Sequence, residues 1–267
     1  MTNAILLSAG QGRRLSPLTD ARPKCLVPVG GRTLLEWQLH ALAACGVRDV
    51  AVVTGYEARA VSAALKTSTA DVEARSLFNP FYGVADNIGS CWTARDLIGE
   101  DTVLINGDTL FDRRVLARVL EEATAPITVT VDVKPAYDAD DMKVRSSGNA
   151  LTAIGKTLTD PIDGESIGLL RFQAGGGAAF ARRMEEMLQD PATLSKWYLT
   201  IIDDMARDAA APEVGVVRID GLPWAEVDFL HDLPIAADRV AGFDWGGASA
   251  GAPAGPRRSS SAGGSAA

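Results

Sequence analysis

Residues 7–29 read LSAGQGRRLSPLTDARPKCLVPV, and this stretch decides the fold. The apolar run 4–8 leads into a turn with glycines at positions 10 and 12, a pattern typical of a buried strand followed by a tight loop. The peptide N–H groups of such a loop can hold phosphate oxygens. Arg13, Arg14, Arg22 and Lys24 concentrate positive charge on the same segment of an acidic chain. The segment therefore predicts a polyphosphate site at the end of the first strand.

Two common phosphate-binding motifs do not fit this spacing. The dinucleotide fingerprint G-x-G-x-x-G requires glycine at position 15, where Leu15 stands. The P-loop pattern G-x-x-x-x-G-K does not occur in this stretch either. A glycine turn beside solvated arginines is the plainer alternative that the residues alone leave open.

Strand-like and helix-like segments alternate through the first half of the chain. The expected strands cover 4–8, 50–54 and 103–105, and the expected helices cover 58–65, 112–123 and a segment between a Thr33–Glu36 capping box and Gly46. This order favours right-handed crossovers onto a parallel sheet. We expect an α/β fold, with a Rossmann-like, mainly parallel but mixed sheet flanked by helices. Ligands should bind at the strands' carboxyl ends, in the loops after residues 8, 54 and 105.

The second half mixes further strands with two helices. The expected strands cover 127–133, 150–154, 165–172, 214–219 and 224–227, and the expected helices cover 175–188 and 197–208. Residues 1–245 have the composition of one globular domain. The segment 246–267 consists mostly of Gly, Ala, Ser and Pro and carries no large apolar side chain, so we expect it to be disordered.

Composition excludes several classes of function. The net charge of −8 and the pI near 4.9 argue against nucleic-acid and anionic-membrane partners. His40 and His231 are the only histidines, too few for a histidine-rich metal site or a Ser-His-Asp triad. Three widely spaced cysteines, no 18-residue apolar stretch and no basic leader predict a cytoplasmic protein. The sequence leaves the oligomeric state open, a homo-oligomer included.

Ordered motifs of this chain resemble a known family. Gly10, Gly12, Arg14 and Leu15, then Pro-Leu-Thr at 17–19, Pro-Lys-x-Leu at 23–26 and Pro-Val at 28–29, are similar to nucleotidyltransferases that activate sugar 1-phosphates and related small phosphates. The resemblance implies a nucleotidyltransferase fold. It also implies a nucleotide-binding loop made of Ala9, Gly10, Gln11 and Gly12.

Two later segments extend the resemblance to the family's metal-binding residues. Asn-Gly-Asp at 106–108 resembles the family's metal-binding Gly-Asp, and Trp-Ala-Glu-Val-Asp at 224–228 resembles the segment that completes the metal site. The resemblance thus implies Asp108 and Asp228 as ligands of Mg²⁺, with Asp108 also facing the nucleotide. Phe229 stands where the family usually has threonine, a change that leaves both carboxylates in place.

The middle of the chain resembles one branch of the family. Asp-Asn-Ile-Gly-Ser at 86–90, Asp-Met-Lys-Val at 141–144 and Glu-Ser-Ile-Gly at 165–168 are similar to segments of phosphocholine cytidylyltransferases and their phosphonate-using relatives. This implies CTP as the nucleotide, contacted by Asn87 and Ser90, although Gly89 replaces the tyrosine usual in that branch. Sugar- or inositol-1-phosphate nucleotidyltransferases and a non-catalytic regulatory relative stay open as alternatives.

Nucleotidyl transfer joins an acceptor phosphate or phosphonate oxygen to the α-phosphorus of the nucleotide and releases pyrophosphate. The acceptor is already ionised at neutral pH, so the protein's task is to hold two anions together and to neutralise charge. Carboxylate oxygens at strand ends suit Mg²⁺. The resemblance implies that Arg14 and Lys24 hold the triphosphate. It implies that Lys143 and Lys156 hold the acceptor phosphate.

A choline-like or amino-terminated acceptor also requires a cation pocket. Aromatic faces and carboxylates bind ammonium groups. The aromatic candidates in this chain are Tyr82, Trp197, Tyr198 and Trp224. The full set of residues that we expect at the acceptor is Asp141, Lys156, Glu165, Tyr198, Trp224 and Glu226.

Overall fold

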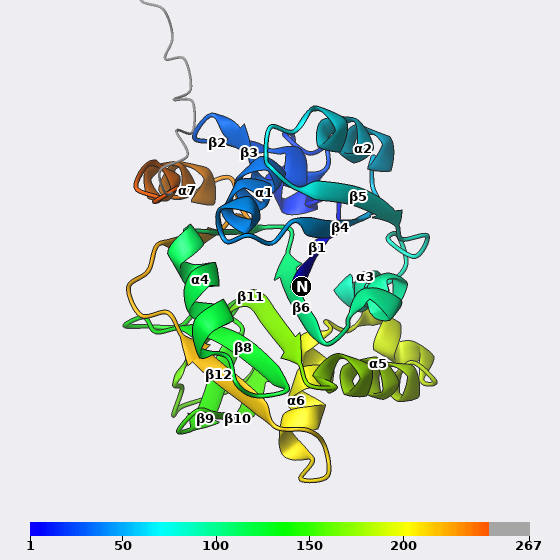
Figure 1. Ribbon diagram of the computed structural model, residues 1–267, viewed down its shortest axis with the longest axis vertical. Helices are drawn as coiled ribbons and strands as arrows, with labels where there is room; N and C mark the ends of the chain where they lie inside the picture. Colours follow the sequence, from blue (N-terminus) through cyan, green and yellow to red (C-terminus); the bar gives the residue numbers. More distant parts are fainter. Residues whose placement is uncertain (246–267) are drawn as a thin grey trace, which may run out of the picture.

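The computed structural model describes residues 1–245, so the predicted tail at 246–267 lies outside the described residues. Nine strands form one sheet in the order β5-β4-β1-β6-β11-β8-β12-β10-β9 (Figure 1). In chain order these strands are β1 (Asn3–Ser8), β4 (Asp49–Thr54), β5 (Glu73–Phe78), β6 (Asp101–Asn106), β8 (Ile127–Asp132), β9 (Lys143–Ser147), β10 (Ala150–Gly155), β11 (Gly164–Gln173) and β12 (Val214–Arg218).

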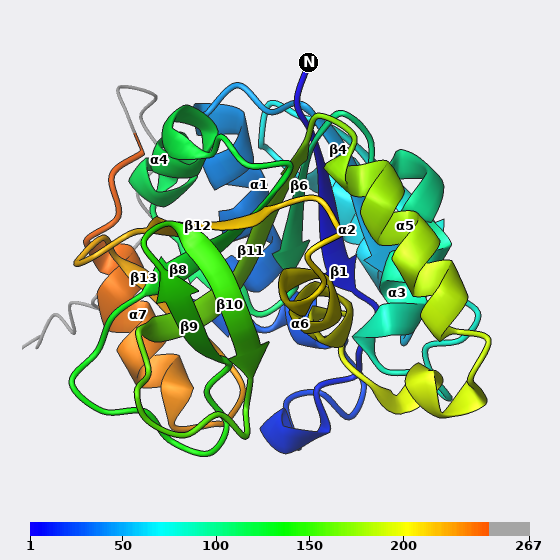
Figure 2. The same ribbon diagram turned by 90° about the horizontal axis from the view of Figure 1, so that it is seen from below.

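Helices cover both faces of the sheet (Figure 2). They are α1 (Leu34–Ala44), α2 (Ala58–Thr67), α3 (Asn87–Ala94), α4 (Arg113–Glu122), α5 (Gly176–Met187), α6 (Leu199–Arg207) and α7 (Asp232–Ala241). Side chains of β1 alternate between two cores, because successive residues of a strand point to opposite faces. Ile5 packs with α3, α5 and α6, whereas Leu6 packs with α1, α2 and α4. The expected α/β layering is therefore present.

The parallel pairing predicted for the first half is confirmed for β4, β1 and β6, and β5, which was not predicted, pairs in parallel with β4. Beyond β6 the sheet is mixed. β11 is antiparallel to both β6 and β8, while β12 returns parallel to β8. Two short ladders complete the fold, β2 (Pro28–Val29) with β3 (Arg32–Thr33) and β7 (Thr109–Phe111) with β13 (Trp224–Glu226).

Half of the predicted capping box forms at α1. The Thr33 hydroxyl accepts a hydrogen bond from the backbone N–H of Glu36 at 3.1 Å, as a helix N-cap should. The reciprocal contact is replaced, because the Glu36 carboxylate accepts hydrogen bonds from the Thr69 backbone N–H and hydroxyl instead. The helix start was therefore predicted correctly, whereas the side chain at its third position joins α1 to the loop that precedes β5.

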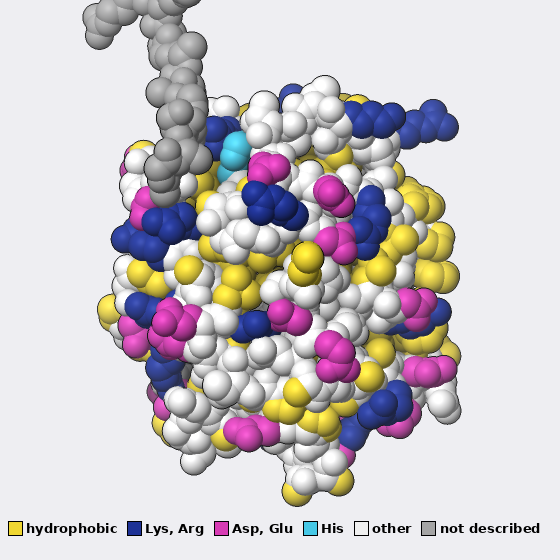
Figure 3. All heavy atoms as spheres, viewed as in Figure 1, with side chains coloured by type: hydrophobic (Ala, Val, Ile, Leu, Met, Phe, Trp, Pro, Cys, Tyr) yellow, Lys and Arg dark blue, Asp and Glu magenta, His cyan; other side chains and the backbone are white. Residues whose placement is uncertain are grey.

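No helix within residues 1–245 is long and apolar enough to cross a membrane. On the face drawn in Figure 3, the described Lys, Arg, Asp and Glu side chains are interspersed, and they leave no extended basic tract there.

Candidate active site

A cavity of about 390 Å³ opens where β1 and β6 end. Carboxyl strand ends in open α/β sheets are the usual place for ligands. Two of the three predicted loops line it, those after residues 8 and 105. The loop after residue 54 does not line the cavity. A Cβ atom at Gly55 would lie 2.4 Å from the Tyr82 Cβ and 2.6 Å from the Ala9 carbonyl oxygen, so the glycine lets these two cavity residues pack closely against the loop.

The glycine turn after β1 leaves space for Lys24. Gly12 has φ of 75°, and a Cβ atom there would lie 2.7 Å from the Lys24 Cβ. Any other residue at position 12 would therefore be strained and would displace the lysine. Because the turn is this tight, the Lys24 ammonium extends into the cavity beside Asp108 and Asp228.

The small ladder between β7 and β13 brings the acidic residues together. Glu226 is paired with Thr109, and the backbone N–H of Val227 donates to the carbonyl of Asp108 at 3.2 Å. Asp108 and Asp228 thus lie side by side although 119 residues separate them in the chain. The Asp232 carboxylate accepts hydrogen bonds from the backbone N–H of Asp228 at 2.8 Å, which holds the late segment in place.

Lys24 and Arg14 neutralise these carboxylates. The Lys24 Nζ lies 2.7 Å from the Asp108 carboxylate and 2.5 Å from that of Asp228, and an Arg14 nitrogen lies 2.9 Å from Asp228. Although desolvation opposes both shifts, these contacts raise the pKa of Lys24 and lower the pKa of Asp228. The site therefore contains charged ion pairs at neutral pH.

Asp108, Glu226 and Asp228 could hold a metal ion. One carboxylate oxygen from each lies within 4.8 Å of those of the others. The Asp108 Oδ1 atom is buried without a hydrogen-bond partner among the described residues, as expected of an oxygen that is left for a ligand. Three hard oxygen donors fit Mg²⁺. Desolvation, together with repulsion from Asp108 and Asp228, raises the pKa of Glu226 to about 8.

Phe229 does more than stand beside the carboxylates. The Arg14 guanidinium lies 4.9 Å from the centroid of its ring, and the His231 ring stacks on Phe229 with centroids 5.2 Å apart. A ring in this position holds a guanidinium through cation–π attraction. The residue that replaces the usual threonine thus leaves both carboxylates in place and also contacts Arg14 directly.

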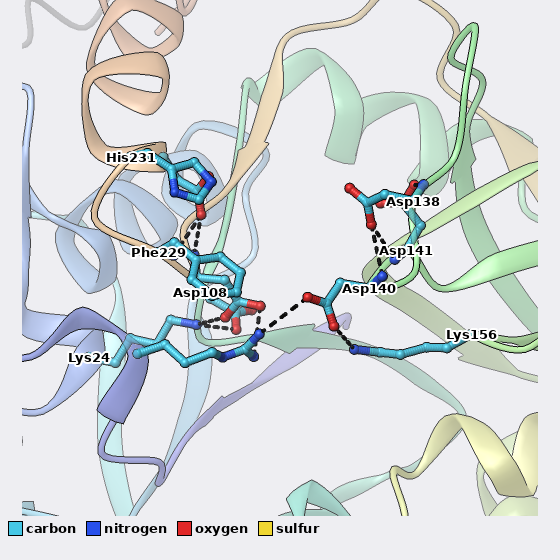
Figure 4. A network of polar contacts seen from close by, with 11 residues as sticks. Lys24, Asp108, Asp138, Asp140, Asp141, Lys156, Phe229 and His231 are labelled. Atoms are coloured by element: carbon cyan, nitrogen blue, oxygen red, sulfur yellow. Dashed lines mark hydrogen bonds and ion pairs between the residues drawn. The ribbon is translucent and has the colours of Figure 1, made fainter.

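The opposite wall of the cavity carries Asp140, Lys156 and Trp197. The Lys156 Nζ lies 3.4 Å from Asp140 and 4.6 Å from the centroid of the Trp197 ring, and Asp140 lies 3.9 Å from Arg14. Figure 4 shows Asp140 between Lys156 and the ion pairs of Lys24. One carboxylate thus connects the cations of the two walls.

Asp141 and Glu165 do not form an empty cation pocket. The Lys134 ammonium lies 2.8 Å from both carboxylates. Asp141 lies outside the cavity, whereas Glu165 is part of its lining. The prediction that both residues receive an acceptor ammonium needs correction, because the Lys134 ammonium already pairs with both of them.

Glu165 should make stability depend on pH. Burial raises its pKa to about 7, against 4.5 for an exposed glutamate. Folding therefore favours the protonated carboxyl group, so this contribution is complete below about pH 4.5 and is lost as the pH rises through about 7. We expect the free energy of unfolding of Glu165→Gln, measured by urea denaturation between pH 4.5 and 7.5, to fall less with pH than that of the wild type. Identical slopes would contradict the assignment, and Glu73→Gln on the exposed edge strand is the control.

Most of the predicted nucleotide residues line the cavity. They are Ala9, Gly10, Gly12, Asn87, Ser90 and Asp108. Gln11 does not line it, and its side-chain oxygen accepts a hydrogen bond from the Arg13 side chain at 3.3 Å. Of the acceptor residues, Lys156, Glu165 and Glu226 also line the cavity. The roles of Lys156, Glu226 and the nucleotide residues stay predictions.

Three predicted residues point elsewhere. Lys143 lies outside the cavity, is nearly buried, and donates to the carbonyl of Lys156 at 2.8 Å, so it supports the segment that carries Lys156. Tyr198 is fully buried in the core, where its backbone N–H donates to the Asn87 side chain at 2.8 Å. The Trp224 indole N–H donates to Asp132 at 2.6 Å, which turns that side chain away from the cavity.

Sequence reasoning missed Asp140 and Lys134. Asp138, Asp140 and Asp141 lie in a loop without strand or helix periodicity, so the sequence gives no signal for which carboxylate faces the cavity. Lys134 follows β8 directly, and only its contacts distinguish it from a solvated lysine. Trp197 was among the aromatic candidates, and the structure places it rather than Tyr198 at the cavity wall.

Comparison with known proteins finds similar sequences and a matching family. Residues 4–210 match the family described as the MobA-like NTP transferase domain. CTP:phosphoglutamine cytidylyltransferase of Campylobacter jejuni is 25% identical over 265 residues, which cover 89% of this chain and 100% of that protein. CMP-5'-(3-aminopropyl)phosphonate synthase of Streptomyces rubellomurinus is 36% identical over 123 residues, which cover 46% of this chain but only 19% of that protein.

A solved structure of the CTP:phosphocholine cytidylyltransferase from Streptococcus pneumoniae has the same fold. It superposes with a TM-score of 0.72 at 18% identity, and the match covers 90% of this chain and 99% of that one. The predicted fold class is thereby confirmed.

Proposed function

Because this chain belongs to the family of MobA-like NTP transferase domains, we propose that it transfers CMP from CTP to a small phosphate or phosphonate acceptor and releases pyrophosphate. The observation that carries the proposal is the conjunction of Lys24 and Arg14 with three carboxylates at the strand ends. The similarity to a CTP-dependent enzyme across that enzyme's whole length supports CTP as the nucleotide.

The residues of the site suit this reaction without a general base. The acceptor is already an anion, so an oxygen of its phosphate or phosphonate attacks the α-phosphorus, and the bond to the pyrophosphate oxygen breaks. Arg14 and Lys24 are placed to neutralise the triphosphate and the departing pyrophosphate. Lys156 is the cation available for the acceptor's anionic end on the other wall. Fixing both anions in one cavity supplies the orientation that the reaction needs.

Asp108, Asp228 and Glu226 would hold Mg²⁺, the metal that we propose for this site. When bound there, Mg²⁺ neutralises phosphate charge and polarises the reacting phosphorus. Asp108 pairs with Lys24, and Asp228 pairs with both Lys24 and Arg14. With Mg²⁺ held by the carboxylates, the Lys24 and Arg14 side chains would be free to pair with the phosphates of the nucleotide.

Pyrophosphate release in the presence of Mg²⁺ tests the proposal. ATP, GTP, CTP and UTP are each combined with phosphocholine, phosphoethanolamine, 2-aminoethylphosphonate, 2-hydroxyethylphosphonate, inositol 1-phosphate and glucose 1-phosphate. We expect turnover with CTP and acyclic acceptors, at least about tenfold above the other nucleotides. Turnover confined to inositol or glucose 1-phosphate would contradict the acceptor class. The absence of pyrophosphate release with every nucleotide–acceptor pair would contradict the proposed activity.

A further inference from the structure

Lys156 occupies a place that is built for a cation. Its Nζ lies 3.4 Å from the Asp140 carboxylate and 4.6 Å from the centroid of the Trp197 ring. A carboxylate combined with an aromatic face is the arrangement that binds alkylammonium groups. Resting on the proposed function, we propose that Asp140 and Trp197 form the subsite for an ammonium group of the acceptor, and that Lys156 fills this subsite until the acceptor arrives.

The contacts of Asp140 are loose enough for such an exchange. Its distances to Lys156 and Arg14 are 3.4 and 3.9 Å, longer than the 2.7–2.9 Å of a direct charge-assisted hydrogen bond. The Asp140 side chain is 59% exposed, so moving it or its partners breaks little packing. Both partners are cations that phosphate groups attract. Once the nucleotide takes Arg14 and the acceptor's anionic end takes Lys156, Asp140 keeps an unpaired charge beside Trp197.

The other carboxylates of the cavity have different partners. Asp108, Glu226 and Asp228 form the three-oxygen cluster, and Glu165 is paired with Lys134. Asp86 caps α3 by accepting the backbone N–H of Asn87 at 2.6 Å. Mg²⁺ would replace the cations at the three-oxygen cluster, and Lys134 stays with Glu165, so among the described residues that line the cavity Asp140 is the carboxylate that the substrates would leave without a counterion.

Asp141 provides a matched comparison. It is the next residue in the chain and carries the same charge, but its side chain is only 11% exposed, lies outside the cavity and is bonded to Lys134 at 2.8 Å. It also accepts the backbone N–H of Asp138 at 2.7 Å. Neutralising Asp141 disturbs the loop without removing a charge from the subsite. Variants at Asp140 and Asp141 thus distinguish recognition of the acceptor from support of the loop.

The test compares two acceptors that differ at one end. 2-Aminoethylphosphonate and 2-hydroxyethylphosphonate share the phosphonate, and only the first carries an ammonium group. The ratio of their kcat/KM values with CTP is measured for the wild type and for Asp140→Asn, Asp140→Glu and Asp141→Asn. We expect Asp140→Asn to lower the amine-to-hydroxyl ratio at least about tenfold, mainly through KM for the amine, and Asp140→Glu to restore part of it. Asp141→Asn should change both acceptors alike and leave the ratio within about threefold.

Trp197→Leu gives an independent readout of the same subsite. Trp197 is 39% exposed, so the variant is expected to fold. The kcat/KM for phosphocholine, divided by that for 2-hydroxyethylphosphonate, should fall at least about threefold, because a quaternary ammonium gains most from the ring face.

The outcomes separate the subsite from the activity itself. A wild type that turns over CTP without preferring the amine, or an amine preference that Asp141→Asn lowers more than Asp140→Asn does, would overturn the subsite and leave the activity standing. A wild type that is silent with every CTP–acceptor pair would overturn both.

Discussion

Asp108→Asn is expected to lower turnover by about 10³-fold or more at any Mg²⁺ concentration while the fold persists. The change keeps the size of the side chain but removes the charge that faces Lys24 at 2.7 Å. It also replaces one of the three clustered carboxylates by a neutral amide, which keeps a single oxygen. An amide is a much weaker ligand than a carboxylate for a hard divalent cation. Raising the Mg²⁺ concentration should therefore not restore the rate.

The measurement is pyrophosphate release with CTP and the best acceptor, over Mg²⁺ from micromolar to tens of millimolar. Circular dichroism and the melting temperature verify folding. Asp101→Asn is the matched control, because Asp101 begins β6, the strand that leads to Asp108, and pairs with Arg171 away from the cavity. Substantial activity in Asp108→Asn would show that the acidic cluster is not the metal site.

Lys24→Met should lower kcat/KM by about 10²-fold or more, because the lysine is placed to stabilise charge that develops on the leaving pyrophosphate. It should also lower the melting temperature in metal-free buffer by about 5 °C, since Asp108 and Asp228 lose their shared counterion. Adding Mg²⁺ should recover part of this loss in melting temperature without restoring the activity. The two readouts thus distinguish the structural and chemical roles of one ammonium group.

Steady-state kinetics and thermal melts with and without Mg²⁺ measure both effects. Lys66→Met on the exposed face of α2 is the control for loss of a surface lysine. A Lys24→Met enzyme that works within about fivefold of the wild type would remove Lys24 from the catalytic machinery. A melting temperature that is insensitive to Mg²⁺ would argue against a metal at these carboxylates.

Strongly patterned elements could be predicted from the sequence, whereas exposed or short ones could not. The apolar run of β1 and the amphipathic α4 have clear periodicity, and the structure confirms both. β5 was missed because three of its six residues are polar or charged, none is buried, and its apolar residues do not alternate with the polar ones. α3 was missed because it is short and contains Gly89. Such elements acquire their structure from neighbours that a local pattern does not reveal.

The same limit applies to the site. Gly12, Lys24, Asp108 and Asp228 could be located from ordered motifs, and the structure brings all four to one cavity. The choice between Asp140 and Asp141 depends on which way a loop turns, and the sequence contains no signal for that. Lys143 carries the ammonium group expected of a phosphate ligand, but this group donates a hydrogen bond to the backbone carbonyl of Lys156.

The ladder between β7 and β13 makes the carboxylate cluster a product of long-range folding. Asp108 meets Asp228 only after the chain has closed a loop of more than 100 residues, which is a slow event compared with forming a helix. A chain still being synthesised could assemble β1, β4 and β6 but would lack the second half of the cluster until β13 left the ribosome. Local opening of β13 would likewise separate the carboxylates without unfolding the sheet. We therefore expect Asp108, Glu226 and Asp228 to come together among the last events of folding.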